Sequence, residues 1–515
     1  MNIPALGIEL GSTRIKACLI DSDDPSIVIA VGEYEWENQL VDGRWSYSLD
    51  DVWAGVQAAY ADLVGKLDSP PQDLAAIGIS AMMHGYLAFG PDDRPLVPFR
   101  TWRNTSTGPA SAALTAEFGV TIPLRWSVAH LYQAVLDEEP HVADVAFLTT
   151  LAGYVHWKLT GERVLGIGDA SGMFPIDDAT RGYDPVMLAA FDVLAAGRLE
   201  PLATLLPAIL PAGRAAGALT AEGAALLDPS GMLRPGILLC PPEGDAGTGM
   251  VATNSVAPRA GNVSAGTSIF AMIVLEHALG AAHDELDLVT TPAGDPVAMV
   301  HCNNGASELA AWVSIFRRFS EAAGQPVGAD AAYSALFLEA LDGEADAGGV
   351  LAYNQLAGEP VVGLPEGRPL VVRTDDSRFT LGNLMRAQLY GVFASLSIGM
   401  AVLDEEGVEL DRMFAHGGVF RTAGVAQRFL AAALGTPVSV AETASEGGPW
   451  GMAVLASYAA SGASESLSEY LDSVVFRGAS FSVVEPQPGD TAGFASYLDR
   501  YRAGLAIERA AVESI

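Results

Sequence analysis

Apolar and polar residues alternate in the same way around a short turn in two distant parts of the chain. Residues 7–21 (GIELGSTRIKACLID) predict a strand, a tight Gly-Ser-Thr turn and a second strand. Residues 261–275 (GNVSAGTSIFAMIVL) predict the same β-hairpin, with Gly266, Thr267 and Ser268 at its turn. Two such hairpins, one in each half, predict an internally duplicated protein that holds a phosphate chain between two lobes.

The remaining periodic stretches predict strands and helices in both halves. In the first half these are a strand at 27–36, an amphipathic helix at 49–67 capped by Ser48 or Asp50, a buried strand at 74–80, a helix within 145–160 ended by Gly161, and a polar turn at 168–172. In the second half they are a strand at 297–302, a turn at 303–305 that caps a helix at 308–319, an irregular segment at 342–376, a buried helix at 381–403, a strand at 413–420, and helices at 425–434 and 452–460. Residues 446–451 open the last helix and are expected to pack against the Gly417-Gly418 region.

A single aspartate lies in the glycine-rich stretch 241–250 (PPEGDAGTGM), near the middle of the chain. This residue, Asp245, follows a short apolar run at 237–240 that predicts a buried strand. Pro241 and Pro242 stop strand pairing, and the glycines around Asp245 let the backbone approach a ligand closely. An aspartate between glycines is often only a turn former. Its position just before the second hairpin nevertheless makes Asp245 a candidate functional residue.

Length and composition limit the class of protein. A chain of 515 residues is too long for one ordinary core, and its length favours two large lobes or three smaller domains. We predict two lobes, at 1–252 and 253–515. Half of the residues are hydrophobic, so the chain can bury a substantial core. The formal net charge of -34 argues against nucleic acid or an anionic membrane as a partner, because phosphate groups would be repelled over most of the surface.

The cysteines and the apolar runs indicate a compartment. Cys18, Cys240 and Cys302 each lie in or beside an apolar run, which is typical of buried, reduced thiols. No CxxC pair or His/Cys cluster indicates zinc. The chain enters a strand directly, and no uninterrupted apolar run approaches the roughly 20 residues that a membrane span needs. These features predict a cytoplasmic protein.

Two segments of the first half are candidates for binding a polyol. His84 follows the buried strand at 74–80, and strand ends are where α/β proteins place ligand contacts; a satisfied core histidine is the equal alternative. Trp102, Arg103 and Asn104 form a loop that offers an aromatic wall and polar contacts, as sugars require. A surface loop pinned by one buried tryptophan is the alternative for that segment.

A pair of glycines in the second half is suited to a nucleotide. The stretch 413–420 (MFAHGGVF) predicts a strand that runs into Gly417 and Gly418, and the amphipathic helix at 425–434 follows. Backbone N–H groups without a neighbouring side chain let a base or ribose approach. A glycine pair alone is weak evidence, and its weight comes from its place in the chain.

Taken in chain order, these motifs resemble the FGGY carbohydrate kinase family, most closely its xylulokinase branch, over essentially the full length. The segments that carry the resemblance are the hairpin at 9–16, Met83-His84-Gly85, the LTGE segment at 159–162, Gly244-Asp245, the hairpin at 264–268, Gly417-Gly418 and residues 446–451. The resemblance implies an α/β, two-lobed, actin-like (ribonuclease H-like) fold. It implies that sugar binds mainly to the first lobe and nucleotide mainly to the second.

The resemblance also implies roles for individual residues. Asp245 matches the catalytic base, and Met83 and His84 match sugar contacts. The two phosphate hairpins correspond to Gly11, Ser12, Thr13 and Lys16 and to Gly266, Thr267 and Ser268, and the adenosine site corresponds to Gly417 and Gly418. ATP and Mg²⁺ are the implied co-substrate and metal, with Glu9 and Asp245 as candidate metal ligands. A ketopentose such as xylulose is the expected acceptor, and a homodimer is the assembly considered.

Four departures from the family pattern leave the acceptor open. Glu9 replaces an aspartate, which keeps the charge on a longer arm. Ala81-Met82 replaces Gly-Gln, Ala246 follows the base where an amide side chain is common, and Trp102 lacks the acidic residue that often follows it. Two other functions therefore stay open: an actin-like ATPase without a sugar acceptor, and a non-catalytic sugar sensor.

Overall fold

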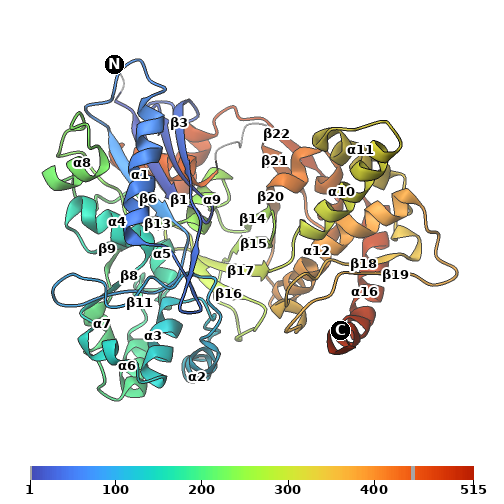
Figure 1. The fold of residues 1–515 in the computed structure, drawn as a ribbon, viewed down its shortest axis with the longest axis horizontal. Helices are drawn as coiled ribbons and strands as arrows, with labels where there is room; N and C mark the ends of the chain where they lie inside the picture. Colours follow the sequence, from blue (N-terminus) through green and yellow to red (C-terminus); the bar gives the residue numbers. More distant parts are fainter. Residues whose placement is uncertain (1–2, 442–446, 515) are drawn as a thin grey trace. The chain divides into compact units, whose positions relative to one another are not determined.

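The computed structural model describes residues 3–441 and 447–514, which form two compact units (Figure 1). The first unit comprises Met1–Ala257, Leu288–Val297 and Ala444–Gly478, and the second comprises Pro258–Asp287, Ala298–Thr443 and Ala479–Ile515. The predicted boundary at 252/253 lies close to the crossing at 257/258. Two later segments of the chain nevertheless belong to the first unit.

A five-stranded sheet forms the centre of the first unit. Its strand order is β13-β6-β1-β2-β3, and its strands are β1 (Ala5–Leu10), β2 (Arg14–Ile20), β3 (Val28–Glu35), β6 (Ala76–Ala81) and β13 (Glu243–Gly244). Strand β1 pairs antiparallel with β2 and parallel with β6, which in turn pairs parallel with β13. The helices of this unit include α1 (Leu49–Val64), α2 (Gly108–Phe118), α3 (Ser127–Leu136), α4 (Leu151–Thr160), α5 (Ile167–Ser171), α6 (Pro185–Ala195), α8 (Ala221–Leu227), α9 (Asp245–Ala252) and α14 (Gly448–Ala460).

A seven-stranded sheet, in the order β16-β17-β15-β14-β20-β21-β22, belongs to the second half of the chain. Its strands are β14 (Ala260–Ala265), β15 (Ile269–Val274), β16 (Asp287–Thr290), β17 (Pro296–Cys302), β20 (Arg412–His416), β21 (Val438–Ala441) and β22 (Phe481–Val484). The helices of the second unit include α10 (Ser307–Ala322), α11 (Ala329–Leu341), α12 (Leu381–Glu405), α13 (Val425–Leu434) and α16 (Pro488–Ser514), with the 3₁₀ helix η4 (Gly418–Arg421) between β20 and α13.

The two sheets repeat one plan. The order β13-β6-β1-β2-β3 corresponds strand by strand to β21-β20-β14-β15-β17. In each sheet the first strand of the predicted hairpin also pairs parallel with a later strand, β6 in one case and β20 in the other. The internal duplication predicted from the two hairpins is therefore confirmed.

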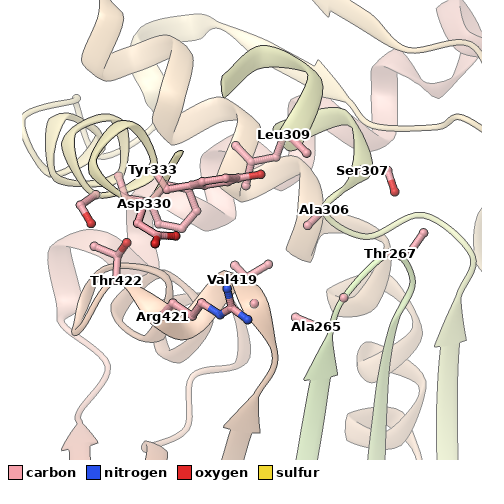
Figure 2. A pocket seen from close by; sticks show the side chains of 15 residues that line it. Ala265, Thr267, Ala306, Ser307, Leu309, Asp330, Tyr333, Val419, Arg421 and Thr422 are labelled. Atoms are coloured by element: carbon pink, nitrogen blue, oxygen red, sulfur yellow. The ribbon is translucent and has the colours of Figure 1, made fainter. Parts of the chain in front are cut away.

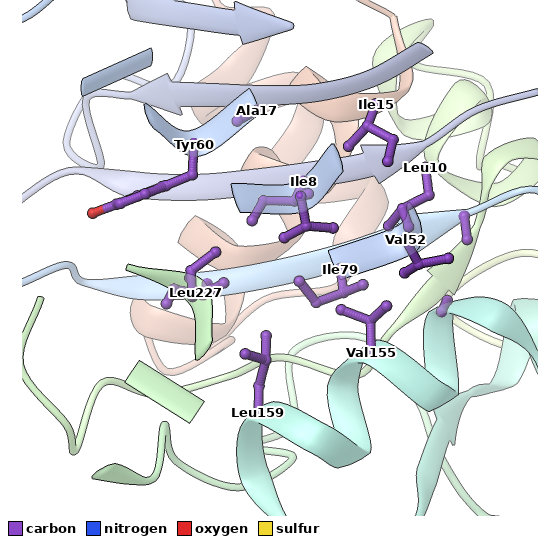
Figure 3. Close-up of a cluster of buried hydrophobic side chains, with 14 of the residues drawn as sticks. Ile8, Leu10, Ile15, Ala17, Val52, Tyr60, Ile79, Val155, Leu159 and Leu227 are labelled. Carbon is purple, nitrogen blue, oxygen red and sulfur yellow. The ribbon is translucent and has the colours of Figure 1, made fainter. Parts of the chain in front are cut away.

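The core of the first unit forms because β1 alternates its side chains between two faces. Leu6, Ile8 and Leu10 point to the face that α1, α4 and α8 cover, where they join a buried cluster that includes Val52 and Val155 (Figure 3). Figure 3 shows side chains from these three helices gathered over the strands. This face fixes the register of β1, because a slip by one residue would move its apolar side chains to the other face.

The opposite face of the same sheet is covered by α14, which comes from late in the chain. Helix α14 packs against β1, β2, β6 and α9. A Cβ atom on Gly7 would lie 2.2 Å from the Pro449 carbonyl oxygen, so the helix backbone rests almost directly on the strand. The prediction that this helix packs against the Gly417-Gly418 region is therefore wrong. Glu446, the first residue of the motif, lies outside the described residues.

Most elements with strong periodicity appear where the sequence predicts them. Ser48 caps α1 by accepting hydrogen bonds from the N–H groups of Asp50 and Asp51, and Gly161 ends α4 in the left-handed conformation. The segment at 342–376, predicted as irregular, contains the short strands β18 (Leu351–Tyr353) and β19 (Leu370–Val372).

Three local predictions are wrong. Residues 237–240 make only isolated bridges, such as Ile77 with Leu239, and the pairing with β6 resumes at β13. Residues 168–172 belong to α5 and its C-cap rather than to a turn. Asn304 does not cap α10, since its side-chain oxygen accepts the N–H groups of Leu356 and Ala357. In each case a distant segment supplies the partner that decides the local structure.

Helix α12 is the one helix in the described part of the chain that is long and apolar enough to cross a bilayer. Its most apolar window has a mean hydropathy of 1.3 and is 78% buried inside the protein. Among its neighbours are α11, α13 and β18. These properties are those of the core helix of the second unit, as the sequence predicts.

Candidate active site

Asp245 lies at the junction of β13 and α9, directly beside the end of β6. The parallel pairing of Gly244 with Ala81 brings the first residue of α9 next to the segment that follows β6. The backbone N–H of Met83 donates a hydrogen bond of 3.3 Å to Oδ1 of Asp245. A Cβ atom on Gly244 would lie 2.1 Å from Cγ of Met83, so only glycine permits this approach. Asp245 is thus the first residue of a helix rather than a turn residue.

The environment of Asp245 raises the pKa of its carboxyl group. Asp245 as a residue is exposed, but its carboxyl group is desolvated by the protein atoms around it. Desolvation raises the pKa to about 6, and the N–H groups of Met83 and Ala246 oppose the shift. A carboxylate with this pKa is ionised at neutral pH and is a better proton acceptor than an ordinary aspartate.

Glu9 lies on β1 in the layer that faces α14. It is paired with Lys16 on β2 and with Ser80 on β6. The pKa of Glu9 is raised to about 8, first by burial and then by the charge of Asp245, while the charge of Lys16 partly opposes the shift. A Cβ atom on Gly448 would lie 2.0 Å from Oε1 of Glu9, so the first residue of α14 closes over this carboxyl.

Two further buried carboxyl groups lie beside Asp245, and sequence reasoning missed both. Asp169 on α5 accepts a 2.6 Å hydrogen bond from Thr150 on Oδ2, while its buried Oδ1 has no hydrogen-bond partner. The pKa of Asp169 is raised to about 7, mainly by burial and in smaller part by the charge of Asp245, while the hydrogen bond from Thr150 opposes the shift. The one sequence signal for Asp169 is the polar stretch at 168–172, which looks like an ordinary turn.

The second of these groups is Glu243, which fixes α5 against β13. Its carboxylate accepts the N–H groups of Gly168 at 3.3 Å and of Asp169 at 2.9 Å. Cβ atoms on Gly166 and Gly168 would lie 2.1 and 2.4 Å from this carboxylate, so the two glycines make room for it. Burial, followed by the charge of Asp169, raises the pKa of Glu243 to about 8.

The raised pKa of Glu243 predicts a pH-dependent stability. Between about pH 4.5 and 8 the unfolded chain releases this proton while the folded chain keeps it, so the free energy of unfolding falls as pH rises. The Glu243→Gln variant has no proton to release. We expect its melting temperature, relative to the parent, to increase steadily from pH 5 to pH 8 in scanning calorimetry. Parallel pH profiles for the two proteins would contradict this, and Glu37→Gln, at an exposed position, is the control.

Met83 and His84, the predicted sugar contacts, lie on the turn that follows β6. His84 has a positive φ of 68°, which is unusual for a residue with a side chain. Its Nδ1 lies 3.1 Å from the carbonyl oxygen of Gly172, and its ring stacks on Trp126. Both residues are about 5% exposed. The structure brings this turn and Asp245 together.

The Trp102 loop meets the tip of the first hairpin. Nε1 of Trp102 lies 3.3 Å from Oγ of Ser12, and the Arg103 guanidinium lies over the Trp45 ring. Asn104 is buried, and its side chain bonds the backbone of Trp45 and Thr101. These bonds hold the loop in place, and the polyol contact predicted for Asn104 stays a prediction.

Aromatic side chains hold the tip of the first hairpin, at Gly11 to Thr13. Trp36 donates from Nε1 to the Gly11 carbonyl oxygen at 2.8 Å, and the Tyr47 hydroxyl donates to the Ser12 carbonyl oxygen at 2.6 Å. With its carbonyl groups bonded, the tip can present hydroxyl and N–H groups to an anion.

The tip of the second hairpin forms one wall of a cavity of about 580 Å³ within the second unit (Figure 2). The predicted nucleotide residues Gly266, Thr267 and Gly418 line this cavity, together with residues at the start of α10. The carbonyl oxygens of Gly266 and Thr267 accept the N–H groups of Ala306 and Gly305. Ser268 belongs to the same turn, through the bond from the Gly266 N–H to its carbonyl oxygen.

The two glycines after β20 differ in what a side chain would meet. A Cβ atom on Gly417 would lie 2.2 Å from the Ala265 carbonyl oxygen, and its φ of 112° also requires glycine. Gly418 has open space on that side, within the cavity wall. Gly417 is therefore needed for the fold, and Gly418 for an unobstructed cavity.

This difference gives a prediction for Gly418. We expect Gly418→Val to fold normally, because the new side chain meets no protein atom, and to weaken ATP binding about tenfold or more by filling the cavity. Calorimetric titration with ATP measures the loss, and Gly108→Val, which also has open space, is the control. Unchanged ATP affinity, or an equal loss of acceptor binding, would contradict the nucleotide assignment.

The acidic groups limit how a metal could be bound. Within residues 3–441 and 447–514, no group of three or more His, Cys, Asp or Glu side chains is arranged to hold a metal ion. Glu9 and Asp245 interact electrostatically, so they form a pair of carboxylates. Mg²⁺ is often held by one or two carboxylates that act with phosphate oxygens and water. This pair fits that pattern.

The duplicated sheets, and the solved structures that resemble them, define a two-domain, actin-like sugar kinase fold. The chain matches the N-terminal domain of the FGGY family of carbohydrate kinases over residues 4–232 and the C-terminal domain of that family over residues 261–460. The chain therefore belongs to the FGGY family of carbohydrate kinases, as the sequence resemblance implies.

Its relatives include kinases for different acceptors. A xylulose kinase of Haemophilus influenzae is 23% identical over 80% of this chain and 82% of its own length. A glycerol kinase of Thermococcus kodakarensis is 23% identical over 36% of this chain, which spans 40% of that enzyme. The solved xylulose kinase from Rhodospirillum rubrum is 22% identical with a TM-score of 0.79, and the alignment covers 98% of each chain. A gluconate kinase from Lactobacillus acidophilus is 18% identical, with a TM-score of 0.80 over 98% and 97% of the two chains.

Proposed function

We propose that this protein transfers the γ-phosphate of ATP to a hydroxyl group of a small sugar, with Asp245 as the general base. The observation that carries the proposal is the position of the Asp245 carboxylate. It is fixed by the Met83 N–H beside His84, and its pKa is raised to about 6. Family membership supports the reaction class, and the acceptor and the residue roles are part of the proposal.

Asp245 acts on the acceptor hydroxyl. Phosphoryl transfer needs an aligned hydroxyl, neutralised phosphate charge and a proton acceptor. The Asp245 carboxylate bonds the attacking hydroxyl and takes its proton as the new P–O bond forms. Met83 and His84 contact the rest of the acceptor, and Trp102 and Arg103 form its wall.

The hairpin tips and α10 bind the phosphates. Ser12, Thr13, Thr267 and Ser268 donate backbone and hydroxyl hydrogen bonds. Gly11 and Gly266 let the phosphates approach the backbone closely, and Lys16 adds a positive charge. No side chain caps the first N–H groups of α10, and this 16-residue helix begins at the cavity wall. Its N-terminus therefore favours a phosphate there. Mg²⁺, with Glu9 and Asp245 as its protein ligands, supplies charge neutralisation for the β- and γ-phosphates when bound.

A ketopentose such as xylulose is the first acceptor to test. The full-length similarity to a xylulose kinase supports it, while the departures at Ala81, Met82 and Ala246 surround the acceptor site and leave other sugars in consideration.

The buried thiols Cys18, Cys240 and Cys302, which form no disulfide, are consistent with the reducing cytoplasm. The predicted homodimer stays a prediction that sedimentation velocity can test.

The experiment is ADP release from Mg-ATP with a panel of ketopentoses, aldopentoses, aldonates, deoxysugars and polyols. Strong stimulation by one compound, with a phosphorylated product of matching mass, supports the proposal and names the acceptor. ADP release that no compound stimulates would favour an actin-like ATPase. Acceptor binding without ADP release would favour a sugar sensor.

A further inference from the structure

The cavity in the second unit has two ends of different chemistry (Figure 2). One end is formed by the hairpin tip, Gly266 and Thr267, and by the start of α10 at Ser307, where N–H and hydroxyl groups suit phosphates. The other end is formed by Asp330 on α11 and Arg421 on η4. A nucleotide bound with its phosphates at the hairpin would direct its base along the cavity, toward the end that carries these two charged residues.

Aromatic and apolar side chains line the space between the two ends. Tyr333 and Phe337, one turn apart on α11, lie with their ring centroids 6.0 Å apart and their planes at 76°. Leu309 and Val419 also line the cavity. Figure 2 shows the Tyr333 ring lying along the cavity wall. A flat heterocycle buries its faces well against such walls.

The two charged groups are available to a ligand. Asp330 and Arg421 are both exposed, and within the described ranges neither side chain forms a hydrogen bond or an ion pair. Figure 2 shows the carboxylate and the guanidinium facing the same hollow. The cavity therefore offers a carboxylate with two acceptor oxygens and a guanidinium with several donors.

We propose that Asp330 and Arg421 recognise a guanine base, so that guanosine triphosphate is a phosphate donor of this protein at least as good as ATP. Guanine carries adjacent N–H donors at N1 and N2, which match the two oxygens of a carboxylate. It also carries acceptors at O6 and N7, the pair that arginine binds through two hydrogen bonds. Adenine instead has one donor, at N6, next to an acceptor, at N1. The lone pair on N1 would repel the second oxygen of the carboxylate. The inference rests on the proposed nucleotide site and extends it to the choice of base.

The test is calorimetric titration of the full chain with ADP, GDP and IDP in the presence of Mg²⁺ and without any sugar. GDP is expected to bind at least as tightly as ADP. IDP, which lacks the 2-amino group, is expected to bind about tenfold more weakly than GDP, because one carboxylate contact is lost. Asp330→Asn is expected to weaken GDP binding about tenfold while changing ADP binding by less than about threefold, and Arg421→Met to weaken GDP binding in the same selective way.

Glu339→Gln, on the same helix but outside the cavity lining, is the matched control and should leave all three affinities unchanged. The inference is overturned if ADP binds about tenfold or more tightly than GDP, or if Asp330→Asn weakens both nucleotides equally, as a contact to the ribose would require. Selectivity for ADP together with sugar-dependent turnover overturns the inference about guanine but leaves the proposed kinase function standing. Preference for GDP without any sugar-dependent turnover supports guanine recognition by Asp330 and Arg421, but it refutes the proposed kinase function and with it the role of GTP as a phosphate donor.

Discussion

Replacing Asp245 by asparagine is expected to lower the turnover number by about 10²- to 10⁴-fold, with little change in the affinity for the acceptor. The amide oxygen of asparagine can still accept the Met83 N–H, so the turn after β6 should keep its geometry. What is lost is the ability to take a proton from the attacking hydroxyl. Steady-state kinetics with the acceptor found in the panel measures both quantities.

The same role fixes the pH profile of the parent enzyme. The base must be ionised, so kcat/KM should rise with pH to a plateau above about pH 6, the value to which burial raises the pKa of Asp245. Asp68→Asn, at an exposed position in the same unit, is the control and should keep full turnover. Near-normal turnover of Asp245→Asn would remove Asp245 as the base.

Replacing Gly7 by alanine is expected to destabilise the first unit strongly. The new Cβ atom would lie 2.2 Å from the Pro449 carbonyl oxygen and 2.4 Å from the Ala453 nitrogen, both backbone atoms that cannot rotate away. Helix α14 would have to move off β1, at a cost of about 3 kcal/mol. The melting temperature of the first unit should fall by about 5 °C or more in scanning calorimetry.

The matched control is Gly249→Ala in α9, where the new Cβ atom has open space and alanine is the better helix former. It should be neutral or slightly stabilising. Activity gives a second measure, because movement of α14 would also displace Gly448 from Glu9. An unchanged melting temperature for Gly7→Ala would show that the helix does not rest on the strand at Gly7.

The features that the sequence predicts correctly depend on residues close together in the chain. Both hairpins follow from strict alternation around a glycine turn, and the bounds of α13, Val425–Leu434, follow from its apolar periodicity. Family membership follows from motifs that keep their order along the chain. Asp245 can be picked out from the sequence because the glycines around it favour neither helix nor strand, so their presence indicates a functional role for this segment.

The features that the sequence does not predict depend on contacts between distant residues. Glu243 and Asp169 look like ordinary polar residues near a turn. Only the parallel pairing of β13 with β6 and the docking of α5 bury both carboxyl groups beside Asp245. Asn304 looks like a helix cap because caps are the commonest role for such a residue, yet its amide holds a segment more than fifty residues away.

The sequence alone determined the hairpins, the duplicated plan, the family and the central aspartate, because alternation, turn residues and motif order are local properties of the chain. Tertiary structure alone decided that α14 closes the first sheet, that the carboxyl groups of Glu9, Asp169 and Glu243 are buried near Asp245, and that Asp330 and Arg421 line the same cavity. The physical reason is the same in each case. Close packing and desolvation act between residues that are near in space, and the number of residues between them in the chain does not predict which of them come together.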